Sequence, residues 1–246
     1  MGTKKDLIRG KKRRTQINKI NTTADTYNIP MKTLKEQTDA KMEAGRQANP
    51  DFMKGVDIEI AKAKEFEQGA NALKIGDVAV NFELPNQQGN LISLSDLKAK
   101  GPVVVTFYRG DWCPYCNLQL RALQARLDEI HTLGATLVAI SPQVHDGSLT
   151  KSEISDMNFT ILSDQNAKVA SQYGVAWEVP EFLLEHMRTD RNLDLQKINN
   201  GNGTVLPIPA TFIINKDGIV VWNYVNVDYR TRSEPEEIIE ALKKLV

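Results

Sequence analysis

The amino-acid sequence predicts an α/β fold over residues 73–246, and three patterns carry this prediction. The run at 102–108 (PVVVTFY) is β-branched and aromatic throughout, as in a strand buried on both faces of a sheet. Residues 114–133 repeat apolar positions at helical spacing before Gly134, and glycine commonly ends helices. A second apolar run follows at 135–140 (ATLVAI), and such alternation is typical of sheets covered by helices.

Two strand-like segments precede the first central strand. Residues 78–84 alternate apolar and polar side chains before Pro85, which predicts a peripheral strand. A turn at 87–90 is expected to return the chain to a second strand at 91–94. This pair would lie at the margin of the central sheet.

The second half of the chain is predicted to complete the sheet. It contains a third strand at 159–162, a short helix at 167–173, a β-hairpin from 210–215 and 219–225, and a closing amphipathic helix at 236–246. Residues 176–208 are expected to form a long irregular insertion with an Asn-Gly-rich tip. Loops of this length inside compact domains are usually functional or mobile.

Residues 31–72 predict a helical extension. Its first helix has a thin apolar stripe, whereas the second begins with a capping Asn49 followed by Pro50. Phe52, Val56, Ile60 and Ala63 fall on one face of that second helix, with Met53 and Phe66 beside it. The stripe could pack on its own domain or form a homodimer contact, and both interpretations stay open.

Residues 1–30 are interpreted as a basic, disordered arm. The first 20 residues carry eight Lys and Arg side chains against a single acidic one, Asp6, so the zero net charge of the whole chain hides a division. The basic run has no interleaved aromatic side chains, so nucleic-acid binding is not favoured. No secretory signal peptide and no apolar run of membrane-spanning length is seen, and we therefore expect a cytoplasmic protein without a membrane segment.

Both cysteines of the chain fall in one C-x-x-C motif, Cys113-Pro114-Tyr115-Cys116, where the buried strand meets the following helix. Unpaired N–H groups and the dipole at a helix N-terminus favour the thiolate, which is the reactive form. A second thiol one turn later is placed to attack a mixed disulfide formed by the first. Pro114 suits the first helical turn, and Trp112 is expected to shield one sulfur and leave the other open. The motif is interpreted as a dithiol/disulfide couple.

Three other interpretations of the cysteines stay open. A zinc site would need two further ligands, and His131, His145 and His186 are widely spaced. A structural disulfide here would close a loop of only four residues and stabilise the fold by about 2 kcal/mol, and two inert buried thiols are the third reading. No Gly-rich phosphate loop or paired-carboxylate site accompanies the motif, so no cofactor and no metal are expected.

A second feature lies far along the chain. Pro207-Ile208-Pro209 leads directly into the strand at 210–215. A proline at the start of a strand is a typical place for a cis X-Pro bond, with a simple trans proline as the alternative.

The segments FYRGDWCPYCNLQLRAL, ISPQ, LSD, LPIPATFIINKDG and VDYRTRSEP together resemble the peroxiredoxin-like branch of the alkyl hydroperoxide reductase/thiol-specific antioxidant family. The resemblance covers residues 73–246 and no part of residues 1–30. It implies a thioredoxin-like fold, which is a central mixed sheet flanked by helices, here with an N-terminal helical extension.

The resemblance assigns roles to the two cysteines in two ways. Matched to thioredoxins, Cys113 is the nucleophile, Cys116 resolves, and Pro209 is a cis-proline that faces the disulfide. Matched to the peroxiredoxin pattern P-x-x-x-T-x-x-C, Cys116 is the peroxidatic cysteine, while Cys113 replaces the Thr and Arg109 replaces the Pro. The chain also has Pro209 where many peroxiredoxins place an arginine. These departures favour dithiol exchange, and Cys113 is taken as the first nucleophile.

The other polar candidates near the motif have alternative readings. Arg109 is expected to lower a thiol pKa or to bind an acidic substrate, unless it is a solvated loop arginine. Asp111 would oppose thiolate formation unless it shuttles protons. Arg230 and Arg232 lie in the resembling segment and are candidates for shaping the site. The three histidines show no nucleophile–base arrangement and are interpreted as structural.

The sequence thus predicts a thiol-dependent antioxidant oxidoreductase that reduces peroxides through a reversible Cys113–Cys116 disulfide. An external electron donor of the thioredoxin or glutathione type would reset it. One alternative is a thiol-disulfide oxidoreductase with little peroxidase activity. Another is a non-enzymatic redox sensor whose disulfide switches residues 176–208.

Overall fold

The structure is a computed structural model that describes residues 32–144 and 157–245. The chain divides into two units, Met1–Met31 and Lys32–Val246, and the described residues all belong to the second. The arm predicted at 1–30 and His145 lie outside the described residues.

A five-stranded mixed sheet forms the centre of the second unit, in the order β5-β4-β3-β8-β9. Strand β3 runs parallel to β4 and antiparallel to β8, and its five residues are all buried. The α/β class and the central strands predicted from the apolar runs are confirmed. The strands are β3 (Val103–Phe107), β4 (Thr136–Ser141), β5 (Thr160–Ser163), β8 (Ala210–Ile214) and β9 (Val220–Val225).

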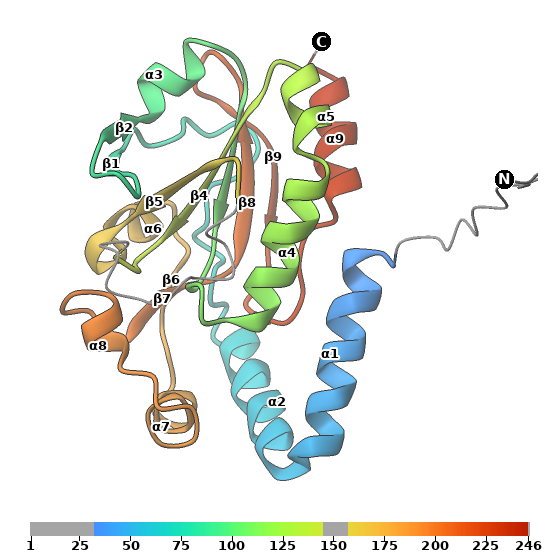
Figure 1. The fold of residues 1–246 in the computed structure, drawn as a ribbon, viewed down its shortest axis with the longest axis vertical. Helices are drawn as coiled ribbons and strands as arrows, with labels where there is room; N and C mark the ends of the chain where they lie inside the picture. Colours follow the sequence, from blue (N-terminus) through green and yellow to red (C-terminus); the bar gives the residue numbers. More distant parts are fainter. Residues whose placement is uncertain (1–31, 145–156, 246) are drawn as a thin grey trace, which may run out of the picture. The chain divides into compact units, whose positions relative to one another are not determined.

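Helices α4 (Pro114–Ala125), α5 (Leu127–Thr132) and α9 (Pro235–Lys243) gather on one side of this sheet (Figure 1). The prediction of one helix over 114–133 is wrong, because the backbone leaves helical geometry at Arg126, with φ −113° and ψ 12°. The Arg126 side chain bonds to Glu129 and, at 2.9 Å, to Glu236 of α9. The break therefore coincides with an ion-pair contact between two covering helices.

Shorter elements connect the central strands. A short helix, α3 (Leu94–Lys98), follows β2, and a 3₁₀ turn, η1 (Gln165–Ala167), leads into α6 (Lys168–Gln172). Strands β1 (Glu83–Pro85) and β2 (Leu91–Ser93) pair as the predicted antiparallel hairpin. The strand predicted at 78–84 is mostly irregular, with one bridge from Val78 to Ile219.

Residues 176–208 are ordered into regular elements, so the prediction of an irregular insertion is wrong. They form β6 (Ala176–Glu178), α7 (Glu181–Thr189), α8 (Leu195–Ile198) and β7 (Val205–Pro207). Strands β6 and β7 pair antiparallel and close the segment on itself. Leu183, Met187 and Leu195 are buried, so the segment also contributes to the core.

Helices α1 (Leu34–Ala48) and α2 (Pro50–Glu65) form the N-terminal pair below the sheet in Figure 1. A Thr33–Glu36 capping box begins α1, and Asn49 caps α2 with Pro50 in its first turn, as predicted. Val56, Ile60 and Ala63 of α2 join the main hydrophobic core. The predicted apolar stripe is therefore buried within the chain itself, whereas Phe66 is 74% exposed.

Helix α7 packs against α2 through aromatic rings. The ring of Phe52 stacks on His186 at 3.7 Å and on Phe182 at 5.6 Å between ring centroids. A Cβ at Gly55 would lie 2.3 Å from the Phe182 ring, so a larger residue there would have to displace that ring. His186 also bonds to Asp190 at 2.6 Å, which supports its structural role.

Among the helices that the structure describes, none combines the length and the apolarity needed to cross a membrane.

Candidate active site

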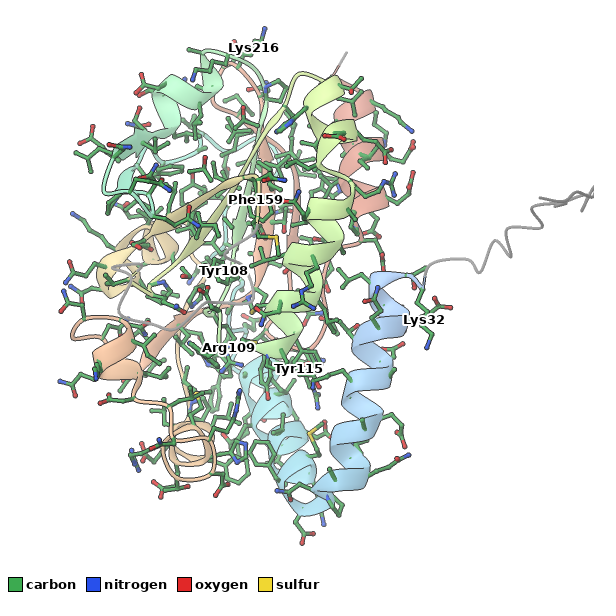
Figure 2. The ribbon with its side chains drawn as sticks, viewed as in Figure 1. Lys32, Tyr108, Arg109, Tyr115, Phe159 and Lys216 are labelled. Carbon is green, nitrogen blue, oxygen red and sulfur yellow. The ribbon has the colours of Figure 1, made fainter. Side chains whose placement is uncertain are left out.

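The cysteine motif lies where β3 ends and α4 begins, at the end of the sheet nearest α2; Tyr108, Arg109 and Tyr115 are labelled around this junction in Figure 2. Cys113 is the N-cap residue of α4, in extended conformation, and Pro114 occupies the first helical position. Cys116 lies in the first turn. The strand–helix placement predicted for the motif is therefore confirmed, and both sulfurs lie near the positive end of the helix dipole.

Both cysteines are free and buried. Cys113 is 1% exposed and Cys116 is 0% exposed. The expectation that Trp112 leaves one sulfur open is wrong, because Tyr115 and Tyr229 pack edge to face here and are themselves buried. A reagent that reaches either sulfur must therefore be small or must wait for a local opening.

Two donors reach the sulfur of Cys116. Arg232 Nη2 lies 3.2 Å from Cys116 Sγ, and the backbone N–H of Arg109 donates to the same sulfur at 3.5 Å. Arg232 comes from the loop of residues 228–234, called the arginine loop below, and is 7% exposed. A buried positive charge at this distance stabilises negative charge on the sulfur pair.

The pKa values of the two thiols are pushed apart. Burial opposes ionisation of Cys113, but a hydrogen bond from Cys116, together with Arg109 and Arg232, holds the Cys113 pKa well below its usual value. Burial raises the pKa of Cys116 well above its usual value, and the neighbouring Cys113 thiolate raises it further. Although Arg232 contacts Cys116, the anion is favoured on Cys113, because Cys116 keeps its proton and donates it toward Cys113.

Arg109 is buried rather than solvated. It is 2% exposed, and its guanidinium carbon lies 4.1 Å from the Tyr229 ring centroid and 5.1 Å from that of Trp112. Such positions over aromatic faces are favourable for a cation. Its Nε and Nη2 atoms are buried without a hydrogen-bond partner. The alternative of a solvated loop arginine is therefore wrong.

The connection from Arg109 to Cys113 needs a glycine. Gly110 has φ +147°, and a Cβ there would lie 2.3 Å from Trp112 Nε1 and 2.9 Å from Gln143 Oε1. Gln143 in turn accepts the backbone N–H of Asp111 at 2.8 Å. The tight turn thus places the Trp112 ring against the Arg109 guanidinium, and Gln143 ties the backbone of the turn to the end of β4.

Asp111 forms hydrogen bonds with Tyr108 and Asn117. Its carboxylate accepts the Tyr108 hydroxyl at 3.0 Å, and its backbone carbonyl accepts Asn117 Nδ2 at 2.9 Å. Burial, followed by the Asp111 charge, raises the pKa of Tyr108 well above its usual value. Tyr108 therefore stays protonated and continues to donate to Asp111.

A buried polar cluster behind the thiols was not predicted. Thr106 of β3 and Thr211 of β8 are register partners whose hydroxyls lie 3.0 Å apart, and Gln119 Nε2 of α4 reaches Thr211 at 3.4 Å. Ser233 of the arginine loop reaches Thr211 at 3.3 Å. The available signal was a threonine in each of two otherwise apolar strands.

Pro209 is buried directly before β8, whose first residue, Ala210, pairs with Phe107 of β3. The described residues contain no cis peptide bond, so the cis-proline expected at this position is wrong. Trans is the lower-energy form of the bond, and the strand start accommodates it. Among the residues that the structure describes, no group of three or more His, Cys, Asp or Glu side chains is placed to hold a metal ion.

Comparison with known proteins gives relatives in sequence and in structure. The family model described as AhpC/TSA family matches residues 75–223. Peroxiredoxin Bcp of Escherichia coli K12 is 29% identical over 174 residues, which cover 71% of this chain and 98% of the relative. The chloroplastic Peroxiredoxin Q of Sedum lineare is 30% identical over 70% of this chain and 76% of the relative.

Solved structures of similar fold include Peroxidoxin BcpB from Mycobacterium tuberculosis. It has a TM-score of 0.54 and 24% sequence identity, with coverage of 71% of this chain and 99% of that one. Mycobacterium tuberculosis AhpC has a TM-score of 0.53 at 16% identity. These likenesses confirm the thioredoxin-like fold predicted from the sequence.

Proposed function

Because this chain belongs to the AhpC/TSA family and is a thiol-based oxidoreductase, we propose that it reduces peroxides through Cys113 and Cys116. The observation that carries the proposal is the thiol pair itself. It lies at the start of α4, where the buried Arg232 contacts Cys116 Sγ at 3.2 Å, and the hydrogen bond from Cys116 together with Arg109 and Arg232 outweighs burial and lowers the pKa of Cys113. A thiolate in such surroundings is an attacking group for a peroxide oxygen.

The first step oxidises Cys113. Its thiolate sulfur attacks one peroxide oxygen, the O–O bond breaks, and the departing oxygen takes a proton and leaves as water or an alcohol. The sulfur is then a sulfenic acid. The Cys116 thiol attacks this sulfur, the S–S bond forms, and the hydroxyl leaves as water. The protonated state of Cys116 before this step keeps its sulfur from competing for the peroxide.

The neighbouring residues have distinct parts in the proposal. Arg109 and Arg232 stabilise the thiolate, and the unpartnered Nε and Nη2 atoms of Arg109 are free to donate to the departing oxygen. Trp112 and the arginine loop limit access to the sulfurs. Pro114 fixes the first turn of α4, and Pro209 fixes the start of β8 beside β3.

The disulfide needs two electrons and two protons from outside. We propose a dithiol donor of the thioredoxin type, with glutathione as the alternative, working in a reducing compartment such as the cytoplasm. Because both sulfurs are buried, exchange with a protein donor requires the start of α4 to open. A homodimer formed through α1 and α2 is also proposed, on the half-exposed Ile58 of α2 and the exposed Phe66, which caps the end of that helix.

Single-cysteine variants test the assignment. Cys116→Ser should retain one rapid turnover of hydrogen peroxide and stop at a sulfenic acid, which dimedone labels at Cys113. Cys113→Ser should consume peroxide slowly. The opposite result, with sulfenic acid formed on Cys116, would give the peroxidatic role to Cys116 and overturn the order proposed above.

A second candidate function is thiol-disulfide exchange. It is favoured by Cys113 and Pro209, which stand where the peroxiredoxin pattern has Thr and many peroxiredoxins have Arg. Insulin reduction measured beside peroxide consumption on the same sample separates the two. Burial of both sulfurs leads us to expect faster peroxide consumption, since a small oxidant needs less opening than a protein disulfide.

A non-enzymatic sensor is the third candidate. Arg191, which follows α7, donates to the Trp112 carbonyl at 3.0 Å and so joins the 176–208 segment to the motif. A sensor would show slow turnover in both assays and a large change in proteolysis of that segment on reduction.

A further inference from the structure

The arginine loop that brings Arg232 to the thiols has no regular secondary structure between β9 and α9. Arg232 is fixed to the loop itself, because its Nη1 donates to the carbonyls of Thr231, at 2.7 Å, and Tyr229. The guanidinium therefore moves wherever this short piece of backbone moves. The same loop supplies the Tyr229 ring that covers Arg109.

The loop is anchored to α2 through one carboxylate. Arg230 Nη1 lies 2.7 Å from Asp57 Oδ1, and Arg230 is also held by Asp228 in a two-pronged pair at 2.8 and 2.9 Å. Asp57 binds Arg46 of α1 on its other side at 2.6 Å. Arg230 is nearly fully buried, and these carboxylates offset the free-energy cost of burying its positive charge.

The loop is also anchored to α1 at its other end. The Glu234 carboxylate accepts the backbone N–H groups of Leu34, at 3.1 Å, and Lys35, at 2.6 Å. These are the first residues of α1, whose N–H groups have no partner within the helix. Arg232 thus lies two residues from each of two anchored loop residues, Arg230 and Glu234, and the partners of both belong to the N-terminal helices.

We propose that helices α1 and α2 act as a positioning device for the active-site arginine, with Asp57 and Glu234 as the positioning residues that hold Arg232 against the cysteine pair. This rests on the proposed function only in taking that pair as the reactive site. Helices α1 and α2 lie outside residues 75–223, which the family model matches.

The test measures thiol reactivity rather than turnover. The full reduced chain is alkylated with iodoacetamide from pH 5 to pH 10, and mass spectrometry follows Cys113 and Cys116 separately. Other charged or titratable groups that act on the thiols are two guanidiniums and three tyrosines: Arg109, Arg232, Tyr108, Tyr115 and Tyr229. Burial raises the pKa of all three tyrosines, that of Tyr115 to about 12, so the profile reports the cysteines.

The variant is Asp57→Asn, with Glu59→Gln as its matched control on the same helix. Glu59 pairs with Lys62 and does not touch the arginine loop. We expect Asp57→Asn to raise the apparent thiol pKa by about one unit, and to slow alkylation near neutral pH about tenfold. Glu59→Gln should leave the profile unchanged. Glu234→Ala, which removes the second anchor, should shift the profile in the same direction.

A double-mutant cycle decides whether Asp57 acts through Arg232. If it does, adding Asp57→Asn to Arg232→Gln should produce no further shift of the thiol profile. Additive shifts, or an Asp57→Asn profile equal to that of the wild type, would overturn the inference. A wild-type chain without a low-pKa thiol would instead contradict the proposed function, so the two failures are distinguishable.

Discussion

The two arginines beside the thiols come from regions that are held in place by different forces. Arg109 follows β3, whose backbone is bonded on both sides within the sheet and whose residues are all buried. Arg232 belongs to a loop that is bonded to the Asp57 carboxylate of α2 and to backbone N–H groups of α1, more than 170 residues earlier in the chain. The region of Arg109 is stabilised by apolar burial, and salt and pH change that stabilisation little. The region of Arg232 is held by ion pairs, whose strength depends on both salt and pH.

The largest expected effect comes from breaking the sheet beside the first region. Phe212 of β8 is fully buried against Phe107 and Tyr173, so Phe212→Ala should lower the free energy of unfolding by about 3–5 kcal/mol. Urea denaturation measures this change. Leu91→Ala, at a position 61% exposed, is the control and should stay within about 0.5 kcal/mol of the wild type.

Removing the positive charge of Arg232 should affect the reactivity of the thiols more than the stability of the fold. We expect Arg232→Gln to raise the pKa of the reactive thiol by about 1–3 units, because a buried positive charge in contact with the cysteine pair is lost. Peroxide consumption at neutral pH should fall at least about tenfold and recover as pH rises. A fall that is equal at every pH would show that Arg232 acts on substrate rather than on the thiolate.

A smaller effect on stability is expected from a side chain added at Gly110, in the turn that connects Arg109 to Cys113. Gly110→Ala places a methyl group against Trp112 and Gln143 in a backbone conformation that suits glycine. We expect a loss of about 1–3 kcal/mol in the free energy of unfolding. Displacement of Trp112 should also speed alkylation of the cysteines at a pH above both thiol pKa values. Unchanged alkylation there would mean that Trp112 does not limit access.

The smallest expected effect is the loss of fold stability at low pH. The hydrogen bond from Arg46 outweighs burial and lowers the pKa of Asp57, and Arg230 outweighs burial to lower that of Asp228. A lowered folded-state pKa contributes stability that is present above the unfolded value, about 4, and is lost as pH falls through the folded value. Urea midpoints should therefore decline below about pH 4. The double variant Asp57→Asn with Asp228→Asn should show a shallower decline.

The sequence was most informative where one pattern was continuous. The run at 102–108 contains β3, and the motif that follows it lies at the start of α4, as predicted. The division of the helix at Arg126 was not predictable from periodicity, since both halves keep their apolar positions. The break coincides with a contact from Arg126 to Glu236, more than a hundred residues later.

The environment of the thiols was only partly predictable, because it also depends on contacts between residues far apart in the sequence. Spacing placed two sulfurs one turn apart, but the contact of Arg232 with Cys116 joins residues 116 positions apart. Nothing in VDYRTRSEP distinguishes Arg232, which faces the sulfur, from Arg230, which faces Asp57. The pairing of β6 with β7 likewise depends on segments whose apolar patterns are too short to predict a sheet.

The Glu234 carboxylate has a consequence for the order in which the protein matures. It accepts N–H groups of α1 that lie about 200 residues earlier, while Glu234 is also the N-cap of α9. During synthesis, the first described helix leaves the ribosome long before the acceptor for its end exists. Arg232 is translated almost as late. A nascent chain therefore carries both cysteines and Arg109 before Arg232, the second charge that acts on the thiols, has been translated.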